Sequence, residues 1–159
     1  MGPPLRALIR DAVSAADIAA VRELFAEYAQ GLQVDLCFQG FAEELATLPG
    51  KYARPRGRLF LADEPPLAGC IALRPLDEEG VAEVKRLYVR PAARGSGLGL
   101  ALVQAVVRDA RAIGYRELRL DTLPNMGDAL RLYERMGFVG RSPYYHNPVP
   151  GTVYMSLAL

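Results

Sequence analysis

The chain has 159 residues, with 19 Lys and Arg against 18 Asp and Glu and a formal net charge of +1. This length predicts one domain, residues 1–159, and a composition of 51% hydrophobic and 23% charged residues is typical of a globular protein rather than a disordered one. The near-neutral charge does not indicate a basic surface that would bind a nucleic acid or an anionic membrane. The sequence also has no apolar segment close to the ~20 residues of a transmembrane helix. We therefore expect no nucleic-acid or membrane partner and, since the first residues lack a signal-peptide pattern, a cytoplasmic protein.

Cysteine and histidine are scarce, which limits metal and nucleophile chemistry. The chain contains Cys37, Cys70 and a single histidine, His146. A structural zinc site needs four nitrogen or sulfur ligands with close paired spacing, so we expect no metal. Both cysteines stand among apolar residues and are predicted to be buried thiols of a reducing compartment. A Cys–His nucleophilic pair that uses His146 is the less favoured alternative.

The first third of the chain predicts one strand and two helices. An apolar segment at residues 5–9 indicates the strand. Ser14 is a suitable N-cap, with Asp17 in the first turn, for a helix that ends near Gly31. The apolar face of this helix repeats at helical spacing, at Ile18, Val21, Phe25 and Tyr28. A shorter helix is expected over residues 41–48.

Three strand-like segments and a long apolar helix follow. The strands are predicted at residues 58–62, 68–74 and 81–89, and the short turns between them favour antiparallel pairing. The helix is predicted at residues 98–113 and ends at Gly114. Because its polar residues form one narrow stripe, this helix must pack across a sheet. The stripe consists of Gln104, Arg108 and Arg111.

The last third alternates strand and helix signals. Strands are predicted at residues 117–122, 138–140 and 152–157, with a short helix at 128–136. The whole order is then β-α-α-β-β-β-α-β-α-β-β. This order predicts an α/β fold with a mixed sheet.

The segment between the third of these strands and the long helix carries the clearest chemical signal. Gly95, Gly97 and Gly99 stand at alternate positions, so that backbone N–H groups can approach an anion closely. The partial positive charge of the following helix N-terminus favours a phosphate or pyrophosphate there, and Arg94 can add a charged contact. The alternative is a glycine-rich turn without a ligand.

Two known anion-binding loops do not match this segment. No Gly-Lys-Ser/Thr follows the glycines, and their spacing is Gly-x-Gly-x-Gly instead of the Gly-x-Gly-x-x-Gly of dinucleotide-binding proteins. Asp121, at the end of the next strand, favours the dinucleotide alternative because a ribose-binding acid would stand there. However, only 38 residues follow Asp121, too few to complete a doubly wound sheet.

Three sequence blocks together resemble a known family. They are the strand Ala-Glu-Val-Lys-Arg-Leu-Tyr-Val at residues 82–89, the turn Arg-Gly-Ser-Gly-Leu-Gly at 94–99, and the helix at 128–138 that ends in Tyr-Glu-Arg-Met-Gly-Phe. In this order and spacing they resemble the acyl-CoA-dependent N-acetyltransferase superfamily known as GNAT. The resemblance implies a mixed, mostly antiparallel central sheet of about seven strands with about four flanking helices. It also implies acetyl-CoA as cosubstrate.

The resemblance assigns cofactor-binding positions residue by residue. The strand before the glycine turn pairs with the amide arm of the cofactor in this family, like an added strand. The implied cofactor-binding residues are Leu87, Tyr88 and Val89 for the pantetheine arm and Arg94, Gly95, Ser96, Gly97, Leu98, Gly99 and Leu100 for the pyrophosphate. Many relatives also place a cofactor-binding asparagine seven residues before the helix tyrosine. Here Asn125 lies eight residues before Tyr133, a departure from the family pattern.

The resemblance also implies catalytic roles. Tyr133 matches the tyrosine that protonates the leaving sulfur, although its spacing with Ala129 and Met136 also suits a core aromatic residue. Glu83 matches a glutamate that acts as base through water in some members. Asp121 is the rival base, and attack by an already neutral amine with only water as relay is a third possibility.

Acceptor specificity in this fold comes from the first helices and the C-terminal hairpin. The corresponding segments are residues 33–41 and 142–151, and Tyr144, Tyr145 and His146 are the candidate acceptor-binding residues. The expected acceptor is a small-molecule or peptide amine, and members of the superfamily are often homodimers. The alternative to an enzyme is a catalytically silent CoA-binding sensor or interaction domain of the same fold.

Overall fold

The computed structural model describes residues 9–32, 36, 40–63, 67–124 and 126–159. The predicted order of strands and helices is confirmed, with two additional short 3₁₀ turns. The strands are β1 (Ile9–Asp11), β2 (Arg58–Asp63), β3 (Leu67–Pro75), β4 (Val81–Val89), β5 (Glu117–Thr122), β6 (Val139–Arg141) and β7 (Val153–Ala158). The helices are α1 (Ala15–Leu32), α2 (Phe41–Thr47), α3 (Leu98–Ile113) and α4 (Gly127–Arg135), and the 3₁₀ turns are η3 (Gly50–Tyr52) and η4 (Pro91–Ala93).

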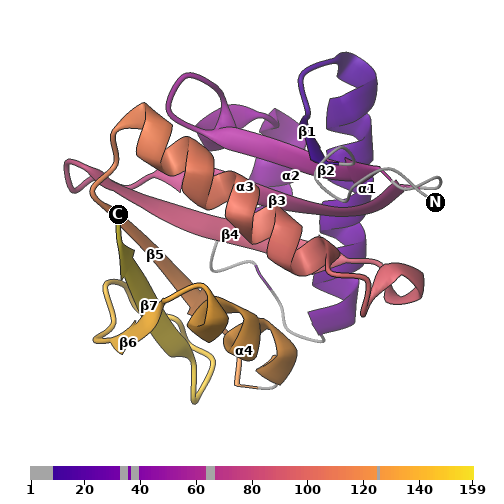
Figure 1. Cartoon of the computed structure of the whole chain (residues 1–159). Coiled ribbons are helices and arrows are strands. Elements are labelled where there is room, and N and C mark those ends of the chain that lie inside the picture. The colour runs from indigo at the N-terminus through magenta and orange to yellow at the C-terminus, as the bar shows by residue number, and fades with distance from the viewer. Residues whose placement is uncertain (1–8, 33–35, 37–39, 64–66, 125) are drawn as a thin grey trace.

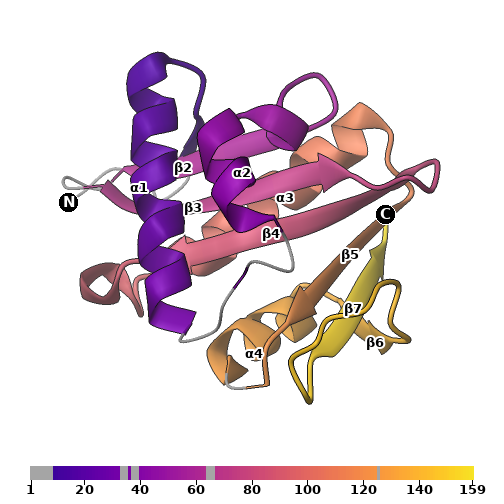
Figure 2. The same ribbon diagram turned by 180° about the vertical axis from the view of Figure 1, so that it is seen from behind.

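The seven strands form one mixed, mostly antiparallel sheet, as predicted. Their spatial order is β1-β2-β3-β4-β5-β7-β6, and β4 and β5 are the parallel pair. Helices α3 and α4 lie on one face (Figure 1) and α1 and α2 on the other (Figure 2). Burying apolar side chains on both faces of the central strands gives two main cores, one beneath α3 and one beneath α1.

Helix α1 begins where its sequence predicts. The Ser14 hydroxyl accepts a hydrogen bond of 3.1 Å from the Asp17 N–H, and Asp17 accepts one of 3.3 Å from the Ser14 N–H. This reciprocal arrangement satisfies two N–H groups that the first turn of a helix leaves unpaired. The helix continues one residue beyond Gly31, to Leu32.

Helix α3 packs across the centre of the sheet. Its buried side chains include Leu102, Val103 and Val106, which contact the core formed by β2, β3 and β4, and the predicted polar stripe is exposed. Gly114 ends the helix with φ of 108°, a left-handed conformation that favours glycine. The N-terminus of α3 follows β4 after the 3₁₀ turn η4 and the glycine turn, and it lies near the end of β4 (Figure 1).

Several sequence expectations need adjustment or lie outside the described residues. The strand predicted at residues 5–9 is described only as Ile9–Asp11, and Cys37 is not among the described residues. Cys70 is buried, as predicted, and its thiol contacts the Arg86 carbonyl oxygen at 3.4 Å. Within the described ranges, no helix has both the length and the apolar character needed to cross a membrane.

Candidate active site

The strands β4 and β5 diverge at the centre of the sheet. Their parallel ladder joins Val81, Ala82 and Glu83 to residues 117–119 and ends there, although both strands continue. The edge of β4 beyond Glu83 therefore faces β5 without ladder pairing. A small cavity of about 40 Å³ lies at this divergence, with Val84, Leu87 and Tyr133 in its wall.

A β-bulge in β4 adds to the irregularity at this point. Cys70 pairs with Tyr88 and Ala72 pairs with Lys85, so β4 has one more residue than β3 over the same stretch. Arg86 lies in the bulge with φ of 60°, a conformation that side-chain-bearing residues rarely adopt. Such bulges re-aim side chains and interrupt pairing beside functional sites. The bulge directs the Arg86 guanidinium toward α2, where it donates to Glu44 at 2.9 and 3.0 Å.

The glycine turn before α3 has the geometry of an anion cradle. Gly95 and Gly97 have φ of 81° and 86°. A Cβ atom built on Gly95 would meet no atom within 4 Å, so the space in front of the turn is open. The first N–H groups of α3 have no partner within the helix, and no described side chain caps them. An anion would satisfy these groups and the helix dipole together.

Three of the predicted cofactor residues also pack within the protein, and the contact at Gly99 was not predicted from the sequence. A Cβ atom on Gly99 would lie 3.1 Å from Leu132 Cδ1, so this glycine permits the close approach of α4 to α3. The side chain of Leu98 is buried in the core, and Leu100 is partly buried. At Leu98, the backbone N–H remains the group available to a ligand.

Arg94 and Ser96 make hydrogen bonds to backbone carbonyl groups next to the glycine turn. Arg94 Nε donates to the Val89 carbonyl oxygen at 3.0 Å, and the Ser96 hydroxyl donates to the Ala93 carbonyl oxygen at 2.5 Å. Both side chains are exposed beside the open space. They are placed to contact an anion that enters the turn.

The side chains of β4 alternate between the two cores. Leu87 and Val89 pack against the core beneath α3, whereas Tyr88 packs on the α1 side and its hydroxyl donates to Glu27 at 3.2 Å. Arg90 also binds Glu27 and locks the end of β4 to α1. The side chains of residues 87–89 are thus occupied by packing. Their backbone groups on the side of β5 lie beyond the end of the ladder and are free of ladder pairing.

Tyr133 lies at the inner end of the divergence. It is 6% exposed, its ring centroid lies 5.6 Å from that of Phe138, and it lines the small cavity together with Asp121. Burial raises the pKa of Tyr133, so the hydroxyl keeps its proton at neutral pH. The residue is thus a core aromatic and a potential proton donor at once.

Glu83 belongs to a different and larger cavity. This cavity of about 900 Å³ lies between α2, the turn after β3 and the C-terminal loop. Glu83 is 3% exposed, and its carboxylate accepts a hydrogen bond of 2.5 Å from the Tyr144 hydroxyl. Lys85 of β4 lines both cavities.

Asp121 is held by the same C-terminal loop. Its Oδ2 atom accepts hydrogen bonds from the Tyr145 hydroxyl at 2.5 Å and from Asn147 Nδ2 at 2.7 Å. Asn147 is buried and also receives the Val149 N–H on its side-chain oxygen at 2.9 Å. The sequence did not identify Asn147 as a site residue. An asparagine before a proline indicates a turn, but it does not show which carboxylate the asparagine side chain will contact.

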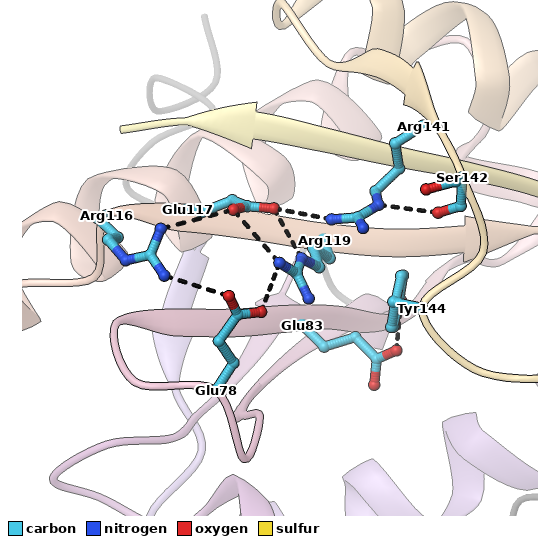
Figure 3. A network of polar contacts seen from close by, with 8 residues as sticks. All are labelled: Glu78, Glu83, Arg116, Glu117, Arg119, Arg141, Ser142 and Tyr144. Carbon is cyan, nitrogen blue, oxygen red and sulfur yellow. Dashed lines mark hydrogen bonds and ion pairs between the residues drawn. The ribbon is translucent and has the colours of Figure 1, made fainter.

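A polar network fixes Tyr144 in place (Figure 3). Glu117 accepts hydrogen bonds from Arg119 at 2.7 Å and from Arg141 at 3.1 Å. These two guanidinium groups lie 5.6 and 5.5 Å from the centroid of the Tyr144 ring, within the range of cation–π attraction. Glu78 binds Arg119 from the turn after β3 at 2.6 Å. The network therefore connects β5, β6 and the loop to the hydroxyl that reaches Glu83.

The predicted acceptor-binding residues have different positions. Tyr144 and Tyr145 line the larger cavity, whereas His146 is exposed and lines neither cavity. Asn125 lies outside the described residues. Burial, together with the adjacent carboxylates Glu83 and Asp121, raises the pKa of both tyrosines. The structure thus brings the loop tyrosines and both candidate bases together.

Comparison with known proteins agrees with this architecture. Residues 18–138 match the acetyltransferase (GNAT) family. The chain is 43% identical over 145 residues to an uncharacterized N-acetyltransferase of Schizosaccharomyces pombe, an alignment that covers 90% of this chain and 89% of the yeast protein.

Solved structures share the fold. A candidate acyl-CoA N-acyltransferase of Klebsiella pneumoniae is similar with a TM-score of 0.70 and 30% identity over 95% of this chain and 96% of that one. An acetyltransferase of Salmonella typhimurium, solved with its cofactor acetyl-CoA, has a TM-score of 0.67 and 21% identity over 94% and 92% of the two chains. From its sequence match and its fold, this chain belongs to the GNAT acetyltransferase family.

Proposed function

We propose that this protein transfers an acetyl group from acetyl-CoA to a primary amine of a small molecule or peptide. The observation that carries the proposal is that Lys85 of β4 contributes to the walls of both cavities. The small cavity lies beside β4 at residues 84–87, on its divergent edge, and Glu83 lines the larger cavity. A donor that follows the edge and an acceptor in the larger cavity would meet at this point of β4.

The residues of the edge and the turn fit a CoA thioester. The open turn at Gly95 and Gly97 would hold the diphosphate, with Arg94 as a charged contact, and the backbone of residues 87–89 would pair with the pantetheine amides. Acetyl-CoA would supply an acyl group activated by a thiolate leaving group. The acetyl-CoA complex of the Salmonella typhimurium acetyltransferase, whose fold this chain shares, supports the assignment.

Proton transfer would use residues on both sides of Lys85. An ammonium group has no lone pair, so the acceptor must lose a proton before it attacks; Glu83 would take this proton directly or through a water molecule. Asp121 is the alternative base, from the wall of the small cavity. Tyr133 would donate its proton to the departing sulfur; burial raises the pKa of this hydroxyl, so it still carries its proton when the thiolate leaves.

Transfer in a single step within a ternary complex agrees with the burial of Cys70. This thiol is 1% exposed, and burial raises its pKa, so it has neither the access nor the thiolate character of a nucleophile. We therefore propose direct attack by the amine rather than passage of the acetyl group through Cys70.

Release of free thiol from acetyl-CoA, measured with a panel of primary amines, tests the proposal. We expect amine-dependent thiol release and a matching mass increase of the acceptor by one acetyl group. Calorimetric binding of CoA without turnover on any amine would instead indicate the catalytically silent CoA-binding domain. Absence of CoA binding would contradict both assignments.

A further inference from the structure

The larger cavity places two basic side chains around a single buried carboxylate. Arg74 on β3 is the register partner of Glu83 on β4, and its Nη1 atom lies 3.6 Å from Glu83 Oε1. Lys85 Nζ lies 3.7 Å from the same oxygen atom. Both distances exceed those of ordinary hydrogen bonds. The Glu83 carboxylate therefore forms ion pairs with two cationic side chains, and its ion pair with Arg74 is longer than a hydrogen bond.

Arg74 has hydrogen-bonding capacity that the described residues do not use. Its side chain makes no hydrogen bond within the described part of the chain, and its Nε atom is buried without a partner. The other arginine in this cavity wall, Arg119, is bonded to Glu117 and Glu78. A guanidinium has five N–H donors, and leaving such donors unpaired in a partly buried position is unfavourable.

Other acids that line the cavity are engaged elsewhere or lie at its exposed surface. Glu44 accepts both hydrogen bonds of the Arg86 guanidinium, and Glu78 is bound by Arg119. Glu43 and Asp77 are exposed. The Arg74 side chain is 24% exposed in the cavity wall, so an anion that arrives with the acceptor could contact the exposed part of its guanidinium, although not the buried Nε atom.

We propose that the acceptor is a free α-amino acid, with its amine at Glu83 and its carboxylate on the Arg74 guanidinium. The inference rests on the proposed function and specifies its substrate class. Opposite charges 3.6 Å apart in the cavity match a molecule that carries amine and carboxylate on one carbon atom. Guanidinium groups bind carboxylates through paired, charge-assisted hydrogen bonds. A peptide N-terminus has an uncharged amide at the corresponding place and would offer Arg74 no carboxylate.

Matched pairs of acceptors test this proposal. We would measure kcat/KM for the common L-amino acids and for the α-carboxamide of each at one pH, with the wild-type protein and with Arg74→Gln. For the preferred side chain, we expect the wild type to favour the acid over the amide by about 10- to 100-fold, the effect of a charged hydrogen-bonded contact. Arg74→Gln should remove most of this preference. An amino acid and its carboxamide differ in the basicity of the amine. This difference cancels when the acid-to-amide ratio of Arg74→Gln is divided by that of the wild type, because both proteins are tested with the same two acceptors.

Lys51→Gln provides the matched control. Lys51 is an exposed cation in the wall of the same cavity, so its loss changes the general charge of the cavity but not the proposed contact. The acid-to-amide ratio should stay within about twofold of the wild type, a difference well below one charged hydrogen bond. Calorimetric titration of the preferred amino acid into the CoA-saturated protein adds a readout without turnover, in which Arg74→Gln should weaken binding and Lys51→Gln should not.

The possible results distinguish failure of the amino-acid assignment from failure of the proposed acetyl transfer. Equal or better activity on amides, activity confined to peptides or to amines without a carboxylate, or an unchanged ratio in Arg74→Gln would overturn the amino-acid assignment and leave acetyl transfer intact. Absence of thiol release with every amine, despite CoA binding, would overturn the proposed function itself.

Discussion

The Tyr144 hydroxyl donates a 2.5 Å hydrogen bond to Glu83 Oε2, although the two residues are 61 positions apart in the chain. The next residue of the loop makes the equivalent contact with the other candidate base, since the Tyr145 hydroxyl donates to Asp121. Two consecutive tyrosines thus each hold one carboxylate. Because each candidate base has its own tyrosine partner, replacing the tyrosines one at a time can show which carboxylate accepts the proton of the amine.

Replacing each tyrosine by phenylalanine should identify the base. Each tyrosine hydroxyl holds its carboxylate in one position, and phenylalanine leaves that carboxylate without the contact. If Glu83 is the base, Tyr144→Phe should lower kcat/KM by about tenfold or more, the effect of one hydrogen bond to a charged group, and Tyr145→Phe should change it by less than about twofold. Thiol release by both variants at one fixed pH is the measurement. The opposite pattern would assign the base to Asp121, and small, equal effects in both variants would favour water as the proton acceptor.

Tyr133→Phe should impair the chemical step while sparing CoA binding. Loss of a general acid typically lowers turnover by about 10²- to 10⁴-fold, and phenylalanine preserves the ring contact with Phe138. Pre-steady-state turnover and calorimetric CoA affinity check the two parts. Tyr115→Phe is the control, because Tyr115 is also buried but bonds the Arg56 carbonyl oxygen; it should alter stability rather than turnover. Equal turnover in Tyr133→Phe and the wild type would remove the acid role.

Gly97→Val should block the anion cradle. A valine side chain would project at the turn and would also strain a backbone with φ of 86°. Gly114→Val carries the same kind of strain at the opposite end of α3, where φ is 108°. We expect CoA affinity to fall by about tenfold or more, equivalent to ~1.4 kcal/mol, in Gly97→Val alone. Matching affinities in the two variants would contradict the placement of the diphosphate.

Asp17 should contribute a pH-dependent part of the stability of the protein. Its carboxylate accepts hydrogen bonds from Arg10, Ser14 and Val13, and these contacts, the one from Arg10 above all, lower its pKa to about 2. Because this pKa is lower than that of an unfolded aspartate, ~3.9, the stabilisation is complete above the unfolded value and is lost as the pH falls toward 2.

Urea unfolding of the wild type and Asp17→Asn between pH 7 and pH 2.5 measures this contribution. The difference in unfolding free energy should be constant at neutral pH and shrink below about pH 4. Asp128→Asn is the control, because Asp128 is fully exposed and pairs with Arg131 on the surface of α4, where ion pairs contribute little. A difference that persists unchanged to pH 2.5 would show that Asp17 acts only as a neutral helix cap.

The sequence alone predicted features that short segments determine. Periodic apolar residues and the Ser14–Asp17 cap indicated α1, and the glycine spacing indicated the tight turn before α3. Both depend on interactions within a few residues, or on backbone freedom at single positions, so they can be inferred without the fold. The parallel pairing of β4 and β5, and the place where it ends, required the assembled sheet.

Contacts across the sheet were decided only by the tertiary structure. No local sequence pattern indicated the bulge at Arg86, the packing of Gly99 against Leu132, or the ion pair of Arg74 with Glu83. The loop tyrosines were candidates for the acceptor pocket, but their hydrogen bonds to the two carboxylates join residues far apart in sequence. Which side chains meet across such distances in the sequence depends on the register of the strands and on the packing of the helices. Neither can be derived from local sequence patterns.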